Sequence, residues 1–217
     1  MELKDSRTAK NLLKAFAGES QARNRYTFAA SVARQEGLEH VAAVFLETAE
    51  NEKEHAKVFF RHLAPLAPSA LEITASYPVV AGDAAAQLKA AFEGEKEEWS
   101  DLYPEFARIA KEEGFADVAR SFTLIARVEK AHEDRYRRLY DHVVNGTVFQ
   151  RGDKIYWRCR ICGYIHEGDM APHLCPAAST RKPTSSPSAR NTEPFGRTLK
   201  PSRPGERRAC DARKLGG

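Results

Sequence analysis

Two pairs of residues with the same spacing could hold a metal in this chain. Glu52 and His55 are separated by two residues, and Glu129 and His132 repeat that spacing. Because residues three apart on a helix lie on one face on adjacent turns, each pair can direct a carboxylate and an imidazole to one point. Glutamate–histidine pairs of this spacing are typical of di-iron and di-manganese bundles.

Three further glutamates lie within apolar stripes at helical spacing, on two other segments. The stripe of one segment reads Leu88, Ala91, Glu95, Glu98, Leu102, Phe106 and Ile109. Unpaired buried carboxylates are costly and repel one another, whereas two iron-sized cations offset that cost and bind hard oxygen ligands. The pattern therefore predicts two iron ions, held by Glu19, Glu52, His55, Glu95, Glu98, Glu129 and His132.

The alternative for a helical glutamate is a solvated side chain or one paired with Lys or Arg. We expect this for Glu50, Glu54, Glu97, Glu112 and Glu113. For the stripe residues the same alternative would require four separate helices to carry glutamates within their apolar faces. The remaining bundle histidines match no ligand spacing and are expected on the surface or at helix ends; they are His40, His62 and His142.

A second candidate metal site lies near residue 160 and lacks one ligand. Cys159 and Cys162 form a CxxC motif, whereas Cys175 begins a CPxC motif whose last position is Ala178. Four thiolates in such motifs make a tetrahedral iron or zinc site. The remaining cysteine, Cys210, has surroundings that do not prepare it to complete the site. We therefore expect one further iron or zinc ion at the three-cysteine site, held weakly or absent.

Four helices must position the glutamates and histidines. Residues 1–145 are rich in Ala, Glu, Lys, Arg and Leu, and their periodicity predicts helices over about 5–36, 38–64, 83–113 and 115–144. The connection after the second helix is long enough to run the length of a bundle, which places the second and third helices parallel. The predicted fold is mainly α, a ferritin-like four-helix bundle over residues 1–146 followed by a small β domain over 147–178.

The basic charge of the chain is concentrated at its C-terminal end. Residues 179–217 carry ten Lys or Arg against three Asp or Glu, and this balance of +7 leaves −3 for residues 1–178 out of the net +4. With almost no large apolar residues, this tail predicts a disordered segment, and we expect no nucleic-acid partner. The charged N-terminal residues and the lack of a long apolar run predict a cytoplasmic protein with no membrane partner.

The helical and cysteine segments together resemble the rubrerythrins. The resemblance is carried by "LLKAFAGESQARNRY", "ETAENEKEHAKVFF", "FEGEKEEWSDLYPEFARIAKEEGF", "IARVEKAHEDRY" and "WRCRICGYIHEGDMAPHLCP", and it covers residues 1 to about 177. It implies a four-helix di-iron domain followed by a rubredoxin-like domain with iron on four cysteine thiolates. In this chain the rubredoxin-like domain is truncated. The resemblance also implies a homodimer in which the two kinds of iron site that meet belong to different subunits.

The resemblance implies an NADH-linked peroxidase that reduces hydrogen peroxide to water and takes electrons from a built-in or external rubredoxin donor. It also assigns roles to the candidate residues. Glu19, Glu52, Glu95 and Glu129 correspond to carboxylate ligands kept in both redox states. Glu98 and His55 correspond to ligands that exchange on one iron, and His132 to a ligand of the other. Tyr26 and Tyr103 correspond to tyrosines that hydrogen-bond to ligating carboxylates; the alternative for both is an ordinary core tyrosine.

Two other functions stay open on the sequence alone: a ferritin-like ferroxidase or iron-storage protein, and a zinc-binding scaffold without catalysis. The second glutamate of the third helix, Glu98, and the appended cysteine domain favour the peroxidase over iron storage. The missing cysteine at position 178 predicts an impaired electron relay within the peroxidase.

The tail suggests a cause for the missing cysteine. If one T is restored before the codon of Ala178, synonymous codons exist that read Cys-Val-His-Pro-Gln-Ala-His-Phe-Glu-Pro-Leu, a continuation similar to the family. A frameshift at this point is therefore a hypothesis for residues 179–217. The nucleotide sequence around codon 178 would test it.

Overall fold

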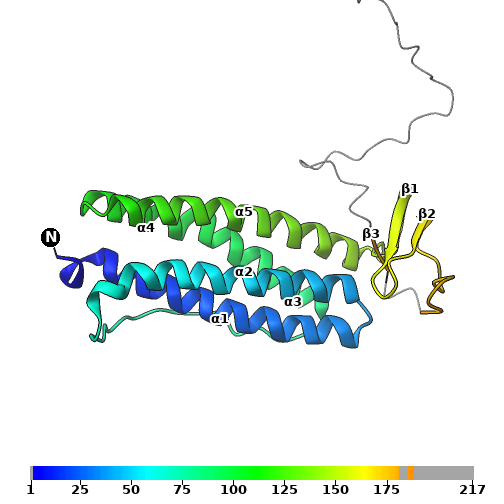
Figure 1. The fold of residues 1–217 in the computed structure, drawn as a ribbon, viewed down its shortest axis with the longest axis horizontal. Coiled ribbons are helices and arrows are strands. Elements are labelled where there is room, and N and C mark those ends of the chain that lie inside the picture. The colour runs from blue at the N-terminus through cyan, green and yellow to red at the C-terminus, as the bar shows by residue number, and fades with distance from the viewer. Residues whose placement is uncertain (1, 181–184, 188–217) are drawn as a thin grey trace, which may run out of the picture.

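The computed structural model describes residues 2–180 and 185–187 of the chain. Along the chain the elements are η1 (Leu3–Asp5), α1 (Arg7–Gln35), α2 (Glu39–Leu63), η2 (Ala64–Leu66), α3 (Ala84–Glu97), η3 (Glu98–Leu102), α4 (Tyr103–Glu112), α5 (Ala116–Val144), β1 (Gln150–Cys159), β2 (Ile165–Met170) and β3 (Ser185–Pro187). The helices form one elongated bundle, and the strands form a small sheet beyond the end of the bundle where α5 finishes (Figure 1).

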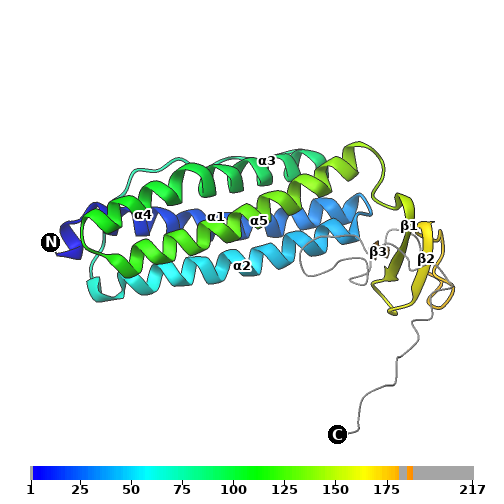
Figure 2. The same ribbon diagram turned by 90° about the horizontal axis from the view of Figure 1, so that it is seen from above.

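The bundle has the topology that the long connection predicts. Helix α1 packs against α2, and α3 and α4 together pack against α5. The segment between η2 and α3 runs back along the outside of the bundle, so α2 and the α3–α4 unit point the same way (Figures 1 and 2). Tyr77 holds this segment against α1, because its hydroxyl donates a hydrogen bond of 2.9 Å to the carbonyl oxygen of Lys14.

Local signals begin and end the helices. The side chain of Ser6 accepts a hydrogen bond of 3.0 Å from the backbone N–H of Ala9 at the start of α1, and the side chain of Asp83 accepts one of 2.8 Å from Ala86 at the start of α3. Gly37 and Gly114 follow the ends of α1 and α4 with φ of 74° and 90°. Glycine adopts this left-handed backbone without strain, so the chain can reverse there.

The third helix differs from the prediction, because it is not continuous over residues 83–113. A π-helical turn, η3, separates α3 from α4, and Pro104 is the second residue of α4. Proline has no N–H to donate to the preceding turn and its ring clashes with the carbonyl oxygen four residues earlier, which accounts for the interruption. The turn shifts the apolar stripe by one residue. Leu102, predicted to face the core, is 37 % exposed, whereas Tyr103 is 2 % exposed.

The bundle core consists of two apolar clusters with the carboxylates between them. One cluster includes Tyr26, Phe45 and Tyr136, and the other includes Leu12, Phe59, Tyr103 and Phe122. Glu19, Glu52, Glu95 and Glu129 are among the largest fully buried side chains of the described residues. The aromatic residues on both sides therefore keep water away from the four carboxylates.

The small sheet has the strand order β2-β1-β3, with β1 antiparallel to both neighbours. Trp157 is its most buried side chain, and the indole N–H donates a hydrogen bond of 3.0 Å to the carbonyl oxygen of Gly168. Strand β3 pairs Ser185 with Cys159, so the prediction of a disordered tail is wrong for residues 185–187. The other tail residues from 181 onward, including Cys210, lie outside the described residues.

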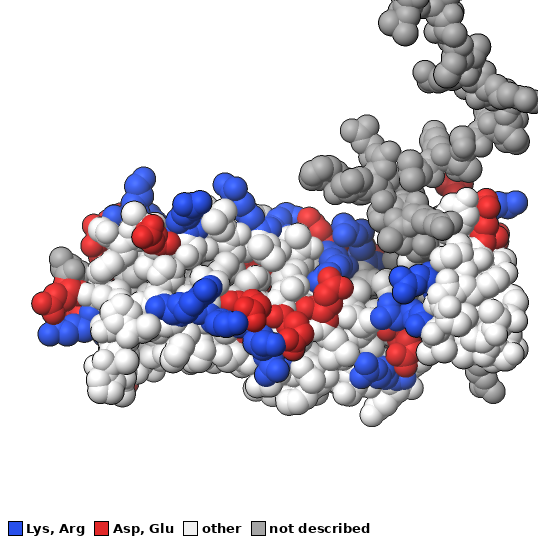
Figure 3. Space-filling view, in the orientation of Figure 1, with Lys and Arg blue, Asp and Glu red and all other residues white. Residues whose placement is uncertain are grey.

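Acidic and basic side chains lie in mixed groups along the helices on the face that Figure 3 shows. The helices also carry exposed ion pairs between residues one helical turn apart, such as Glu105 with Arg108 and Lys89 with Glu93. In the described part of the chain, none of the helices combines the length and the apolar character that crossing a membrane requires.

The expectation that Glu113 is solvated or paired with Lys or Arg is wrong. Its carboxylate accepts hydrogen bonds from the backbone N–H groups of Arg7 and Thr8, at 3.0 and 2.8 Å, and from the Thr8 hydroxyl at 2.6 Å. These are free N–H groups of the first turn of α1, so a residue distant in sequence caps this helix.

Replacement of Glu113 with Ala should lower the free energy of unfolding by about 1 kcal/mol, the usual cost of losing a helix cap. Glu112→Ala is the matched control, because Glu112 pairs only at the surface with Arg108 and should cost less. Urea unfolding of the two variants measures the difference. Equal midpoints would show that the cap contributes nothing.

Candidate metal centre

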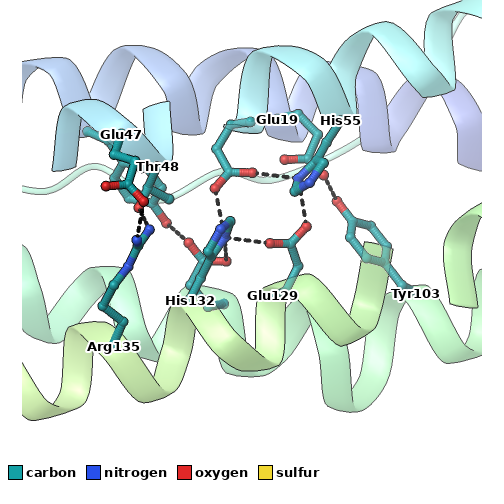
Figure 4. Close-up of polar contacts among 11 residues, drawn as sticks. Glu19, Glu47, Thr48, His55, Tyr103, Glu129, His132 and Arg135 are labelled. Atoms are coloured by element: carbon teal, nitrogen blue, oxygen red, sulfur yellow. Dashed lines mark hydrogen bonds and ion pairs between the residues drawn. The ribbon is translucent and has the colours of Figure 1, made fainter. Parts of the chain in front are cut away.

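Four helices of the bundle each contribute a buried acid to one region of the core. Glu19 comes from α1, Glu52 from α2, Glu95 from α3 and Glu129 from α5, and each side chain is at most 1 % exposed. Carboxylates are seldom fully buried unless they are paired or bind a metal. The two histidines of the glutamate–histidine pairs point into the same region, with Glu129 between them (Figure 4).

These side chains form two groups that could each hold a metal ion. The first group is Glu19, Glu52, His55 and Glu129; the second is Glu52, Glu95, Glu129 and His132. Within each group one ligand atom per residue lies within 4.8 Å of the others. Glu52 and Glu129 belong to both groups, as carboxylates that bridge two ions must. The structure therefore brings six of the seven predicted ligands together, in two groups that share Glu52 and Glu129.

The polar atoms of the groups show whether a metal fits. One oxygen of Glu19 has no hydrogen-bond partner. The oxygens of Glu52 and Glu129, and one oxygen of Glu95, face the imidazole Nδ1 atoms of His55 and His132. Carboxylates buried together in this way are costly unless a cation balances their charge. Hard oxygen donors and imidazole nitrogens that converge in this way fit two iron ions.

The histidines partly balance the charge of the acids when no metal is bound. His55 Nδ1 lies 2.9 Å from oxygens of both Glu52 and Glu129, and His132 Nδ1 lies 2.8 Å from Glu129 and 3.1 Å from Glu52. Burial alone would lower the pKa of each imidazole, but these carboxylates outweigh it and raise the pKa of His55 to about 10 and that of His132 to about 12. Both rings are therefore cations at neutral pH in the metal-free chain.

The acids respond differently according to their neighbours. Burial acts on Glu52 most strongly, yet hydrogen bonds from His132 and His55 hold its pKa at about 2. Burial raises the pKa of Glu95 to about 8, and the charge of Glu52 adds to the effect. Burial likewise raises the pKa of Glu19 well above its ordinary value, followed by the charges of Glu52 and Glu129. In the metal-free centre, Glu95 and Glu19 therefore hold protons more tightly than ordinary carboxyl groups do, and a bound cation would replace these protons.

Two tyrosines hold carboxylates of the centre. The hydroxyl of Tyr26 donates a hydrogen bond of 2.5 Å to Oε1 of Glu95, and the hydroxyl of Tyr103 donates one to Oε1 of Glu19. Both tyrosines are buried in the aromatic clusters. Each bond occupies one carboxylate oxygen and leaves the other directed into the centre. Such bonds fix the orientation of a ligand.

Glu98, the seventh predicted ligand, is not part of either group. It is half-buried at the start of the π-helical turn and lines a cavity of about 290 Å³. Arg25, Tyr77 and Tyr103 also line this cavity. Burial raises the pKa of Glu98 well above its ordinary value, and the charges of Glu95 and Glu129 raise it further. Its carboxylate therefore lies within the electrostatic field of the centre and on the wall of a cavity beside it.

Sequence reasoning missed one further buried acid near the centre. Glu133 is 5 % exposed and accepts a hydrogen bond of 2.6 Å from the indole N–H of Trp99 and one of 2.7 Å from Arg137. It lies next to His132 but points away from the apolar stripe, so periodicity gave no signal for it. The pairing holds α5 against the π-helical turn that carries Glu98.

The three cysteines form a separate group in the small domain. Their sulfur atoms lie within 4.8 Å of one another, and Cys162 Sγ is 3.5 Å from Cys175 Sγ. The four-thiolate iron site that the resemblance implies does not fit the described residues, because the fourth position is Ala178. Cys210 lies outside those residues.

The shared position of Glu52 gives a stoichiometric prediction for the bundle. Glu52→Ala should lower iron in the protein from about two ions per chain to near zero, since both groups lose a ligand. Glu19→Ala should leave about one, because Glu19 belongs to the first group alone. Glu54→Ala is the surface control. Metal analysis of protein loaded with Fe²⁺ under anaerobic conditions measures the iron content. Equal losses of iron in Glu52→Ala and Glu19→Ala would contradict the assignment of Glu52 to both groups.

The retained protons predict how stability depends on pH. Glu95, His55 and His132 all bind protons more tightly in the fold than in the unfolded chain, so the metal-free protein loses stability as pH rises from about 5 to 9. The low pKa of Glu52 changes stability only below pH 4.5, so it does not offset the loss of stability at higher pH. Each retained proton contributes at most about 1.4 kcal/mol per pH unit.

Metal loading should reverse the trend, because bound cations replace these protons and bind more tightly as pH rises. Thermal unfolding of metal-free and Zn²⁺-loaded protein between pH 5.5 and 8.5 measures both slopes. We expect the gap between the two melting temperatures to widen with pH. A metal-free protein that becomes more stable over this range would contradict the assignment of these protons.

Comparisons with known proteins agree with this geometry. The family model described as rubrerythrin matches residues 10–140, and the model described as the rubredoxin-like domain of rubrerythrin matches residues 157–177. The chain is 56 % identical to rubrerythrin of Porphyromonas gingivalis over 178 residues, which are 82 % of this chain and 88 % of that protein. It is 54 % identical to rubrerythrin-1 of Clostridium acetobutylicum over 177 residues, which are 81 % of this chain and 91 % of that protein.

Solved structures show the same fold. Nigerythrin in a mixed-valence state is 32 % identical and superposes with a TM-score of 0.57, covering 85 % of this chain and 90 % of that one. A bacterioferritin from Desulfovibrio desulfuricans, 23 % identical with a TM-score of 0.59, covers 68 % of this chain and 86 % of its own, and shares the fold. With its di-iron ligands in a ferritin-like bundle and its cysteines in a small sheet, the chain belongs to the rubrerythrin family.

Proposed function

We propose that this oxidoreductase of the rubrerythrin family reduces hydrogen peroxide to water in the cytoplasm and so protects the cell from oxidative stress. The reaction takes two electrons and two protons, breaks the O–O bond and yields two water molecules. Two ferrous ions in the bundle would supply one electron each. The pair would be held by Glu19, Glu52, His55, Glu95, Glu129 and His132, with Glu98 as a further ligand.

The position of Glu98 is the observation that supports peroxide reduction best. Its carboxylate lines the cavity beside the centre, while the carboxylates of both metal groups are fully buried. A small neutral molecule such as hydrogen peroxide fits a cavity of about 290 Å³. With metal bound, a carboxylate on the cavity wall could serve as a further ligand, while Glu52 and Glu129, which both groups share, stay in place.

The other residues would keep the rest of the centre rigid. Tyr26 and Tyr103 hold Glu95 and Glu19 at one oxygen each. Glu52 and Glu129 are shared by both groups and receive the imidazole nitrogens of His55 and His132. Catalysis benefits from such preorganisation, because ligands that are already oriented need no rearrangement during electron transfer.

Electrons for repeated turnover come, in this proposal, from an NADH-linked external donor of the rubredoxin type. The built-in relay is impaired, because the described residues of the small domain offer three thiols rather than four. A homodimer would bring the cysteine domain of one subunit near the bundle of the other.

Rapid mixing of anaerobic di-ferrous protein with hydrogen peroxide or with O₂ tests the proposal against a ferritin-like ferroxidase. We expect oxidation by peroxide to be at least about tenfold faster than by O₂. Cleavage of the O–O bond of one hydrogen peroxide takes two electrons, which is the number that two ferrous ions supply. Glu98→Gln should reduce the peroxide rate more than the iron content. Faster oxidation by O₂, together with release of ferric iron, would favour the ferroxidase.

Glu93→Gln is the matched control for Glu98→Gln. Glu93 lies on α3, the helix that leads into the π-helical turn of Glu98; it is exposed and pairs at the surface with Lys89. Its variant should keep both the iron content and the peroxide rate of the parent chain. A loss of rate in both variants would show that the effect arises from helix α3 as a whole and not from the cavity wall.

A further inference from the structure

The first cysteine loop of the small domain is a tight turn closed by backbone hydrogen bonds. The N–H of Gly163 donates to the carbonyl oxygen of Cys159 at 2.9 Å, and the N–H of Cys159 donates to the carbonyl oxygen of Tyr164 at 2.9 Å. Gly163 has φ of 79°, which lets the chain turn back beside the sulfur atoms. Cys162 lies within this turn, three residues after Cys159.

The second loop repeats this turn although its second cysteine is missing. The N–H of Ser179 donates to the carbonyl oxygen of Cys175 at 2.8 Å, and the N–H of Cys175 donates to the carbonyl oxygen of Thr180 at 2.8 Å. Ser179 takes the place of Gly163 and also has positive φ, 52°. A non-glycine residue adopts this backbone at a cost, so the surrounding hydrogen bonds must hold it. Ala178 N–H still points at Cys175 Sγ, at 3.4 Å.

The turn brings the hydroxyl of Thr180 to one cysteine sulfur, that of Cys159. Thr180 Oγ1 lies 3.5 Å from Cys159 Sγ, and Cys162 Sγ lies 3.5 Å from Cys175 Sγ. A tetrahedral zinc ion with bonds of about 2.3 Å to sulfur and about 2.1 Å to oxygen separates its ligand atoms by roughly 3.5–3.8 Å. The two distances match two of the six edges of a tetrahedral site with three sulfurs and one oxygen, and the three sulfurs lie within 4.8 Å of one another.

We propose that Cys159, Cys162, Cys175 and the hydroxyl of Thr180 form a metal site of three sulfurs and one oxygen, which binds a tetrahedral divalent ion of the zinc class. Binding releases three thiol protons, leaves the Thr180 hydroxyl neutral and involves no change of oxidation state. Zinc has no redox chemistry, so the ion has a structural role and carries no electrons. The assignment concerns the small domain alone and does not depend on peroxide reduction in the bundle.

Titration with Co²⁺, a coloured substitute for zinc, tests this site in the full chain. Thiolate-to-cobalt charge transfer in the near ultraviolet arises from cysteine sulfur, so the glutamates and histidines of the bundle do not contribute. Competition with Zn²⁺ then gives the affinity. The parent chain should bind one ion in this way. Thr180→Val, which keeps the shape and removes the hydroxyl, should weaken binding about tenfold or more, whereas Thr180→Ser should retain it.

Two further variants separate the possible sources of the fourth ligand. Ala178→Cys should raise the charge-transfer intensity by about one third, because the fourth thiolate joins a turn that is already formed. Cys210→Ser should change nothing; a loss of binding there would mean that a sulfur from the tail completes the site and would overturn the proposal. Unchanged affinity in Thr180→Val would also overturn it, since water would then supply the oxygen.

The double variant Thr180→Val/Ala178→Cys shows whether Thr180→Val still folds. Recovery of tight binding with a four-thiolate spectrum would show an intact domain and assign the loss in Thr180→Val to the missing ligand. Failure of the double variant to bind would show that Thr180 maintains the turn rather than the metal, and the proposal would be wrong.

Discussion

Burial of four carboxylates between two apolar clusters is the constraint on which the bundle depends. Glu19, Glu52, Glu95 and Glu129 come from four different helices, and their carboxylates lie close together around two histidines. Without a metal, protons on the two histidines and on the raised-pKa acids must offset the repulsion. The arrangement therefore favours cations over protons as pH rises, and the same feature that weakens the metal-free fold prepares the centre for two iron ions.

Rigidity and mobility are distributed unevenly around this centre. The shared acids and the two tyrosine-bound acids are fixed by partners on neighbouring helices, which suits ligands that must not move. Glu98 instead lies at the first residue of a π-helical turn and beside a cavity. A π turn lacks the regular hydrogen-bond spacing of the α-helix, and such turns are frequent at functional sites. The interruption beside Pro104 thus places a π-helical turn, with Glu98 as its first residue, next to this cavity.

The ligand set could be predicted from sequence because the ligands and the buried apolar residues recur at the same helical spacing. A glutamate in line with phenylalanine and leucine on each of four helices has few physical explanations, and the structure brings six of the seven predicted side chains together. The shift from Leu102 to Tyr103 was missed because the stripe was extended through Pro104 at a constant period. Glu133 and Glu113 were missed because their partners, Trp99 and the first turn of α1, are distant in sequence.

The small domain illustrates a different relation between sequence and structure. Both cysteine turns are closed by backbone hydrogen bonds of the same pattern, whether the second cysteine is present or replaced by Ala178. The turn is therefore a property of the backbone and of one left-handed residue, Gly163 or Ser179, rather than of the fourth metal ligand. A chain can lose that ligand and keep the turn, so that loss of a single thiol alters which metal fits without removing the architecture that presents it.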